Sequence, residues 1–140
     1  MLATGAVVVL LLAVVSFKGD VLRGWLHQSD LERIQGRWKD VSFKVNGMTS
    51  PINHGDYYVF KGEILRMIMG ADREVVKSYY LDEDHQPGWF DMTSSKSRRL
   101  IGIYELDGDT LRICTNTQKR PTAFESKPGS ENYLWVLQRE

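Results

Sequence analysis

From Gly36 to the C-terminus, closely spaced turn signals divide the chain into short runs of β-forming residues. The strongest signal is Asp107-Gly108-Asp109, which favours a tight hairpin between the two runs that flank it. Asn46-Gly47, Gly62 and Gly70 mark further reversals of the chain. These signals predict eight strands, at residues 38–45, 57–61, 64–69, 74–81, 89–92, 100–106, 110–115 and 132–139.

Eight strands with hairpin-length connections and almost no helix predict an all-β antiparallel meander. An open meander leaves two unpaired edges, and closure into a barrel removes both of them. We therefore expect residues 29–140 to form an eight-stranded antiparallel barrel domain, with residues 122–125 as a further edge. Some strands, such as residues 100–104, are apolar on both faces, so a two-sheet sandwich stays open as the alternative.

The N-terminal segment 1–17 is separate in character, because Leu2 to Phe17 carries no charge and is mostly Val, Leu and Ala. At about 1.5 Å per residue this run reaches only ~24 Å, short of the ~30 Å hydrocarbon layer. It therefore predicts a signal peptide or a membrane anchor, with a buried N-terminal helix as the alternative. The expected location is extracytoplasmic, in the periplasm or cell envelope, and residues 18–28 are expected to form a linker.

The start of the barrel domain combines a helix signal with a conflict in strand alternation. Residues 29–32, Ser-Asp-Leu-Glu, fit a capping box and predict a short helical turn that ends at Gly36. If Trp38 points inward, strict alternation also places Asp40 inside and the apolar positions that follow it outside. A β-bulge near Asp40 would reset the alternation; otherwise Trp38 lies at the barrel end and the interior begins at Val41.

Charge and composition exclude several classes of function. Lys and Arg number 18, as do Asp and Glu, and the charges are interspersed, so no basic stripe is available for a nucleic acid. The three histidines, His27, His54 and His85, lack the spacing of metal ligands. The acidic loop 82–85 (Asp-Glu-Asp-His) is interpreted as a solvated turn, with a hard cation as the alternative. We therefore expect no cofactor and no metal.

No catalytic constellation is visible either, and we expect the protein not to be an enzyme. The single cysteine, Cys114, lies in a predicted strand and is interpreted as a packed structural thiol. Ser94, Ser95 and Ser97 lack the surroundings of a nucleophile elbow. The basic loop at residues 96–99 is interpreted as solvated, with contact to anionic lipid or a partner as the alternative.

Aromatic and methionine side chains are the best candidates for the barrel lining. In a small barrel they either fill the interior or surround one small apolar molecule, and we favour a filled or narrow interior. The candidate lining residues are Phe43, Tyr58, Phe60, Met67, Met69, Tyr79, Tyr104 and Trp135.

Gly36-Arg37-Trp38, which follows a short helical turn and opens the first strand, resembles the G-x-W signature of the lipocalins. The resemblance implies a tryptophan that closes one end of the barrel, with a basic residue near the end of the last strand packed across it. Arg139 stands in that place, where a guanidinium over the Trp38 indole would form a cation–π contact.

A longer set of motifs is similar to an uncharacterised domain family found in many copies in planctomycete bacteria. The resemblance covers about residues 30–139 and implies frequent export signals, but it supplies no activity and no catalytic residue. Its motifs are Gln35-Gly36-Arg37-Trp38, Tyr79-Tyr80-Leu81-Asp82, the block from Ile101 to Cys114 (IGIYELDGDTLRIC), and Lys119-Arg120-Pro121-Thr122.

Two functions remain open from the sequence. The first is an exported or membrane-anchored binding domain for a small apolar ligand or lipid in the cell envelope. The second is a non-catalytic structural or protein-interaction domain with a filled barrel, motivated by strands that are apolar on both faces.

Overall fold

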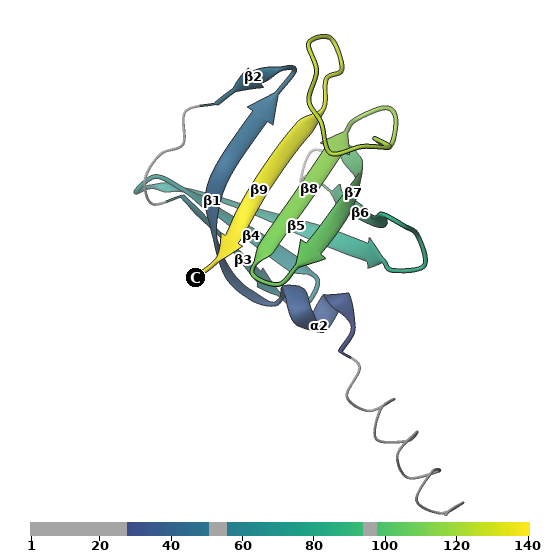
Figure 1. Ribbon diagram of the computed structural model, residues 1–140. Helices are drawn as coiled ribbons and strands as arrows, with labels where there is room; N and C mark the ends of the chain where they lie inside the picture. The colour runs from purple at the N-terminus through teal and green to yellow at the C-terminus, as the bar shows by residue number, and fades with distance from the viewer. Residues whose placement is uncertain (1–27, 51–55, 94–97) are drawn as a thin grey trace, which may run out of the picture.

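The computed structural model describes residues 28–50, 56–93 and 98–140. Within them the chain forms one short helix and one antiparallel sheet that curves into a barrel (Figure 1). The elements are α2 (Asp30–Ile34), β1 (Gly36–Val45), β2 (Met48–Thr49), β3 (Tyr57–Lys61), β4 (Ile64–Met69), β5 (Arg73–Asp82), β6 (Gly88–Thr93), β7 (Arg99–Asp107), β8 (Thr110–Asn116) and β9 (Tyr133–Arg139).

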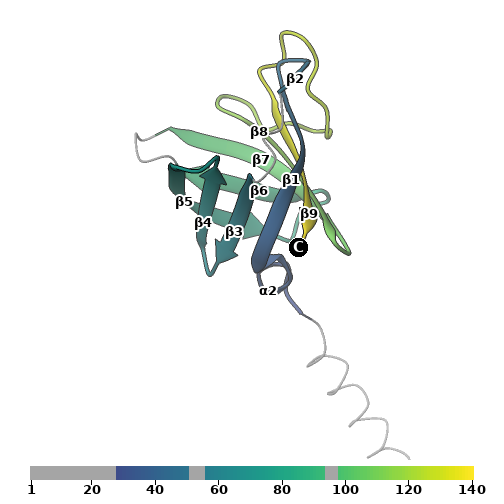
Figure 2. The ribbon, with the colours of Figure 1, turned by 90° about the vertical axis from the view of Figure 1, so that its left-hand side faces the viewer.

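Strand β1 closes the barrel because it pairs with both β3 and β9. Residues 36–39 of β1 pair with β3, and residues 38–45 pair with β9, so the ladder of hydrogen bonds runs around the whole ring (Figure 2). β2 is an addition beside the far end of β1. The predicted eight-stranded antiparallel meander barrel is confirmed, and the sandwich alternative is wrong because the ladder is continuous. The apolar segment 1–17 and the linker 18–28 lie, apart from residue 28, outside the described residues.

A β-bulge in β1 settles the conflict in alternation. The register against β9 shifts between Asp40 and Ser42, which leaves Val41 as the extra residue. Trp38 and Asp40 therefore both face the interior, Val41 is 43% exposed, and Phe43 returns to the interior beyond the bulge. The bulge predicted near Asp40 is confirmed, and the alternative in which the interior begins at Val41 is wrong.

Helix α2 is short because its two ends are capped within two turns. The Ser29 hydroxyl accepts a hydrogen bond from the backbone N–H of Glu32 at 3.2 Å, as the capping box predicts. Gly36 then turns the chain into β1 with φ +115°, a conformation that L side chains rarely adopt. A Cβ at Gly36 would also lie 3.3 Å from a guanidinium nitrogen of Arg139, so this position has a second reason to be glycine.

Trp38 and Arg139 close the end of the barrel next to α2. Trp38 is fully buried, and its indole N–H donates to the Ile34 carbonyl at 2.8 Å. The Arg139 guanidinium lies 4.2 Å from the centre of the Trp38 ring. It also donates to the carbonyls of Arg33 and Gln35, which lie at the end of α2 and lack helical partners. The contact expected between these two residues is therefore present, and it ties the end of β9 to the helix.

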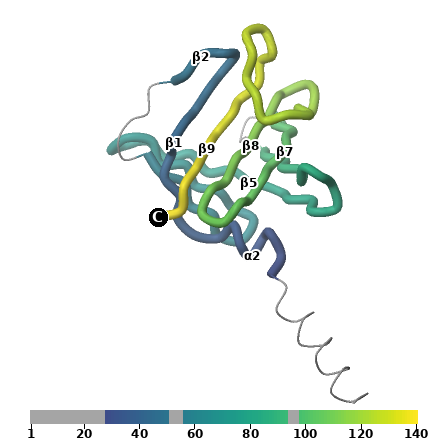
Figure 3. Tube along the Cα trace, in the orientation of Figure 1, coloured from purple at the N-terminus to yellow at the C-terminus, as the bar shows by residue number. Residues whose placement is uncertain are grey.

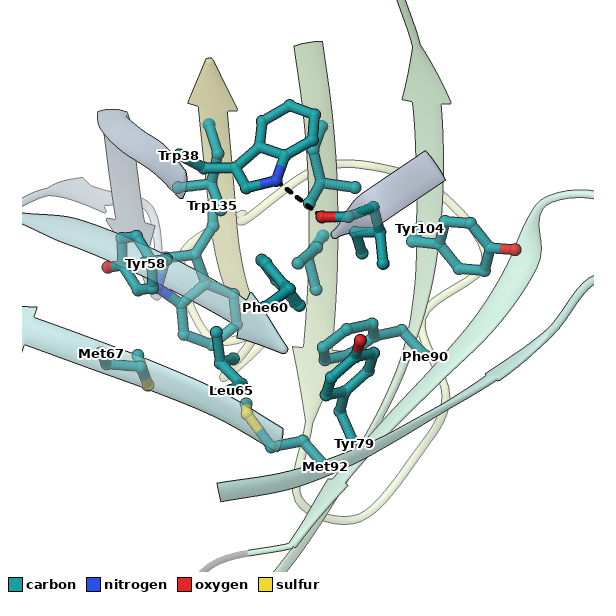
Figure 4. Packing of buried hydrophobic residues seen from close by; sticks show 14 residues of the cluster. Trp38, Tyr58, Phe60, Leu65, Met67, Tyr79, Phe90, Met92, Tyr104 and Trp135 are labelled. Atoms are coloured by element: carbon teal, nitrogen blue, oxygen red, sulfur yellow. Dashed lines mark hydrogen bonds between the residues drawn. The ribbon is translucent and has the colours of Figure 1, made fainter. Parts of the chain in front are cut away.

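The middle of the barrel is filled with side chains (Figure 4). Phe60 meets Tyr79 edge to face with ring centres 5.1 Å apart, and Tyr79 stacks on Phe90 at 5.8 Å. The void that remains beside Phe60 and Phe90 has a volume of about 10 Å³, which is near the lower limit for a single water molecule. The filled interior favoured from the sequence therefore describes the middle of the barrel.

Residues 117–132, which we call the strap, cover part of the outer surface at the ends of β8 and β9 (Figure 3). Phe124 packs there against a small cluster of outward-facing residues that includes Ile103, Cys114 and Leu134. This cover explains why several strands are apolar on both faces. The edge strand expected at residues 122–125 is wrong, because this segment forms no strand and contributes only the partly buried aromatic side chain of Phe124.

A buried ion pair fastens the strap to the barrel wall. The Arg120 guanidinium donates to Asp91 at 2.6 Å and to the Gly102 carbonyl at 2.7 Å, and it lies 4.0 Å from the centre of the Trp89 ring. Arg99 binds the other Asp91 oxygen at 2.5 Å. Burial alone would raise the pKa of Asp91, but the two guanidinium groups outweigh it and lower that pKa below the ordinary value.

Candidate functional site

The end of the barrel opposite Trp38 and Arg139 contains a hollow, which we call the cup. Its volume is about 330 Å³, at the lower end of the range for sites that bind small molecules. The cup adjoins the filled middle of the barrel, and its lining comes from β1, β3, β4, β9, the first residue of β5 and residues that flank β2, β3 and β4. It is lined by Asp40, Phe43, Ser50, Asp56, Tyr58, Met67, Met69, Gly70, Arg73 and Trp135.

Aromatic and methionine side chains form most of the inner wall of the cup. Phe43 stacks on Trp135 with ring centres 5.2 Å apart and planes inclined by 23°. Tyr133, two residues before Trp135 on β9, extends the stack. Met67 and Met69 belong to one face of β4, where their flexible thioethers adapt to the shape of a guest. This wall offers a largely apolar surface to a ligand.

Asp40 places a carboxylate inside this apolar wall. Its Oδ2 accepts a hydrogen bond from the Tyr58 hydroxyl at 3.1 Å, while its Oδ1 is buried and has no hydrogen-bond partner among the described residues. Burial raises the pKa of Asp40, the Tyr58 hydrogen bond opposes the rise, and the charge of Asp56 adds to it. Burial, together with the charge of Asp40, likewise raises the pKa of the Tyr58 hydroxyl, which therefore stays protonated and donates.

The rim of the cup is polar and is held by the backbone. Asp56 Oδ1 accepts the backbone N–H of Gly70 at 2.8 Å, which fixes the turn between β4 and β5. The Asp56 carbonyl accepts the backbone N–H of Asp40 at 3.3 Å, so the two acidic residues are tied together. Arg73 lies across the rim and is exposed. The cup thus has an apolar wall, one inner carboxylate and a charged rim.

Five of the eight predicted lining residues meet at the cup: Phe43, Tyr58, Met67, Met69 and Trp135. Phe60 and Tyr79 lie deeper and fill the middle of the barrel. Tyr104 is also part of the core, but its hydroxyl leaves the barrel and donates to Asp30 of α2 at 2.7 Å. These three residues contribute to the core and do not line the cup.

Sequence reasoning missed the polar half of the cup, which comprises Ser50, Asp56, Gly70 and Arg73 as well as Asp40. Asp40 carried a signal, because strict alternation from Trp38 already placed it inside the barrel. The other four lie at strand ends or in turns, and no spacing in the sequence indicates that these turns meet at one rim.

The remaining sequence candidates lie elsewhere. In the acidic loop, Asp82 accepts the backbone N–H of Asp84 at 3.0 Å, and the His85 ring stacks on Trp89 with centres 3.4 Å apart. Among the described residues, no three His, Cys, Asp or Glu side chains gather as a metal site would require. His27, His54, Ser94, Ser95, Lys96 and Ser97 lie outside the described residues.

Cys114 is buried beneath the strap, and its thiol faces the Glu125 carbonyl at 3.5 Å. Burial raises the pKa of this thiol, which is the opposite of what a reactive cysteine requires. The neighbouring Arg112 guanidinium lies 4.4 Å from the centre of the Phe124 ring and pairs with Glu105 at 2.7 Å. Cys114 therefore acts as a packing residue of the outer cluster.

Two further hollows lie outside the barrel. One, of about 670 Å³, lies between α2 and the turn before β6, and the other, of about 370 Å³, lies within the strap. Both are lined mainly by polar and charged residues, and neither has the apolar wall of the cup. Size alone would favour the first, but the mixture of an apolar wall and few polar groups favours the cup as the binding site.

No described helix has the length and apolar character needed to cross a membrane. Comparison of the chain with protein-family models, with curated proteins and with solved structures found no match. The functional assignment therefore depends on the geometry of the cup.

Proposed function

We propose that this protein is a non-catalytic binding domain that holds a small, largely apolar ligand in the cup. The observation that carries the proposal is the contrast along the barrel axis. The middle of the barrel is packed down to a void of about 10 Å³, whereas the opposite end opens into a hollow of about 330 Å³ with an aromatic and methionine wall. Packing of the whole interior would have been the more stable arrangement for a purely structural barrel.

The proposal includes export to the cell envelope, by a signal peptide or a membrane anchor at residues 1–17. The first described residues lead into α2 at the closed end of the barrel, away from the cup (Figure 1). A tether at this end is compatible with ligand entry at the other. Lipocalin-like ancestry and membership of the planctomycete domain family belong to the same proposal, and rest on the motifs in the sequence.

The five methionines provide the test. In full-length protein labelled with ¹³C at the methionine methyl groups, 2-phenylethanol should shift the signals of Met67 and Met69, which line the cup. Met48 is 71% exposed on β2 and serves as the internal control. Met69→Trp should fill the cup and abolish the shift at Met67, whereas Met48→Trp should not. Equal small shifts at all methionines would contradict the proposal, and so would the absence of any shift at Met67 and Met69 with both 2-phenylethanol and its charged analogues.

A second function, a protein-interaction domain, is supported by an apolar patch on the outer face of β4 and β5. Tyr80 is 61% exposed and Val76 49% exposed, and both flank Ser78, which is paired with the 41% exposed Ile64. Exposed apolar residues grouped in this way are typical of contact surfaces. Tyr80→Ser with Val76→Thr should abolish self-association in sedimentation experiments if the patch binds a second copy, and should leave ligand binding in the cup unchanged.

A further inference from the structure

The carboxylate of Asp40 lines the cup together with Phe43 and Trp135, and it has no cationic partner among residues 28–50, 56–93 and 98–140. Its hydrogen bond from Tyr58 is neutral, and none of the ion pairs formed by the described residues involves Asp40. Phe43 and Trp135 stand in the same cup, with their rings stacked on each other. A barrel whose interior is simply filled gains no stability from an inward-facing carboxylate beside aromatic rings.

We propose that the cup selects a small organic cation, whose ammonium group meets Asp40 and whose apolar body lies against Phe43 and Trp135. The inference rests on the proposed function, since it names the ligand class for the same cup.

An ammonium group fits the cup better than a neutral or an anionic group does. It carries both charge and N–H donors, and charge-assisted hydrogen bonds to a carboxylate are stronger than neutral ones. The faces of Phe43 and Trp135 also attract cations. A hydroxyl could donate one hydrogen bond but would bring no charge, and an anion would be repelled by Asp40 and by Asp56 at the rim.

The charges around the cup favour the same choice. Asp40 and Asp56 contribute two carboxylates, and Arg73 contributes one guanidinium. Arg73 is exposed at the rim, and no ion pair in the described part of the chain joins it to Asp40 or Asp56. The lining therefore has a net negative charge, with the apolar wall close beside it.

The size of the cup limits the ligand. At the packing density of a protein interior, a volume of about 330 Å³ accommodates roughly a dozen non-hydrogen atoms. A phenyl ring with a two-carbon linker and one polar head group falls within this limit. Such compounds allow the head group to be changed while the apolar body stays the same.

The test uses three probes of this kind on full-length protein: 2-phenylethylamine, 2-phenylethanol and 3-phenylpropionate. We expect calorimetry or methionine-methyl titration to show the amine binding at least tenfold more tightly than the alcohol, and the carboxylate binding most weakly. In Asp40→Asn the amine should lose at least tenfold in affinity, while the alcohol should change by less than threefold. Glu74→Gln is the matched control. Glu74 pairs with Arg66 on the exterior, so its replacement removes one negative charge outside the cup.

The outcomes separate this inference from the proposed function. If all three probes bind at the cup with similar affinity, or if Asp40→Asn leaves the preference for the amine intact, the cation inference is overturned and the binding function stands. If Glu74→Gln weakens amine binding as much as Asp40→Asn does, the preference reflects overall charge, and the role of Asp40 is overturned. If none of the probes shifts Met67 or Met69 in folded protein, the binding function fails, and the inference fails with it.

Discussion

Replacement of Arg120 by methionine should destabilise the barrel by removing the ion pair that fastens the strap. The guanidinium touches both Asp91 oxygens, the Gly102 carbonyl and the Trp89 ring, and the side chain is only 20% exposed. Methionine preserves most of the apolar length of the side chain but leaves Asp91 with one partner fewer and removes the Arg120 donor from the Gly102 carbonyl. The change therefore tests the charged contacts rather than the packing.

The size of the destabilisation depends on which partners Asp91 keeps after Arg120 is replaced. Removal of one member of a buried pair typically costs about 3–5 kcal/mol. Asp91 retains Arg99 at 2.5 Å, although the Arg99 side chain is 65% exposed and its contribution is screened by solvent. We therefore expect a loss of about 2–3 kcal/mol in the free energy of unfolding. For a domain of this size that corresponds to a fall in Tm of about 8–12 °C.

The assay is thermal and urea unfolding followed by circular dichroism, with Arg66→Met as the matched control. Arg66 forms an exposed pair with Glu74 at 3.6 Å, which should contribute at most about 0.5 kcal/mol. Arg120→Lys should fall between wild type and Arg120→Met, because an ammonium keeps the charge but not the planar set of donors. If Arg120→Met costs no more than Arg66→Met, the strap is not held by this ion pair and the reasoning is wrong.

Three further predictions follow from the described contacts. The pKa of Asp91 is lower in the folded than in the unfolded protein. The contribution of Asp91 to stability is therefore complete above the unfolded pKa of about 3.9 and is lost as the pH falls through the lower folded pKa. Asp91→Asn should reduce the pH dependence of the free energy of unfolding measured between pH 2 and 5. Gly102→Ala should cost about 1–3 kcal/mol in urea unfolding, because its Cβ would lie 2.3 Å from the Cys114 carbonyl oxygen; equal stability would contradict the close approach. Cys114 should resist labelling by a thiol reagent in native protein and react fully in urea, and rapid native labelling would refute its burial.

Much of the barrel could be predicted because local and global signals agree in it. The residues from Tyr57 to Lys61 and from Ile64 to Met69 are strands with the predicted bounds, since Gly62 fixes the turn between them. The bulge followed from a local contradiction: Trp38 had to face inward, and no regular strand could then place Phe43 inside as well.

The outer cluster beneath the strap could not be predicted. Periodicity shows that Ile103 has apolar neighbours on both faces, but it does not show what covers the outer face. The cover is Phe124, which lies in a segment without regular structure, held there by the pairing of Arg120 with Asp91 across a long separation in sequence. Such contacts depend on where the strap runs, and no short-range pattern encodes that path.

The candidate site likewise has one part that the sequence predicts and one part that it does not. The apolar wall of the cup could be predicted, because large apolar side chains on the strands of a small barrel mostly point into its interior. The polar rim could not be predicted, because Ser50, Asp56 and Arg73 lie at or beside the ends of separate strands that meet only when the barrel closes. The three lining candidates that the structure places elsewhere are deep-core residues, and sequence alone does not give the depth of a side chain along the barrel axis.

The bulge at Val41 links the fold to the proposed function. Without the extra residue, β1 could place either Asp40 or Phe43 in the interior, and the bulge allows both to face it. For stability alone this is a poor arrangement, because burial raises the pKa of Asp40: the cost of holding it ionised is present above the raised pKa and disappears as the pH falls through it. An apolar side chain at residue 40 would avoid that cost. The bulge thus brings a carboxylate inside the barrel at a cost in stability. The proposed binding of a cationic ligand gives Asp40 a role that accounts for this cost.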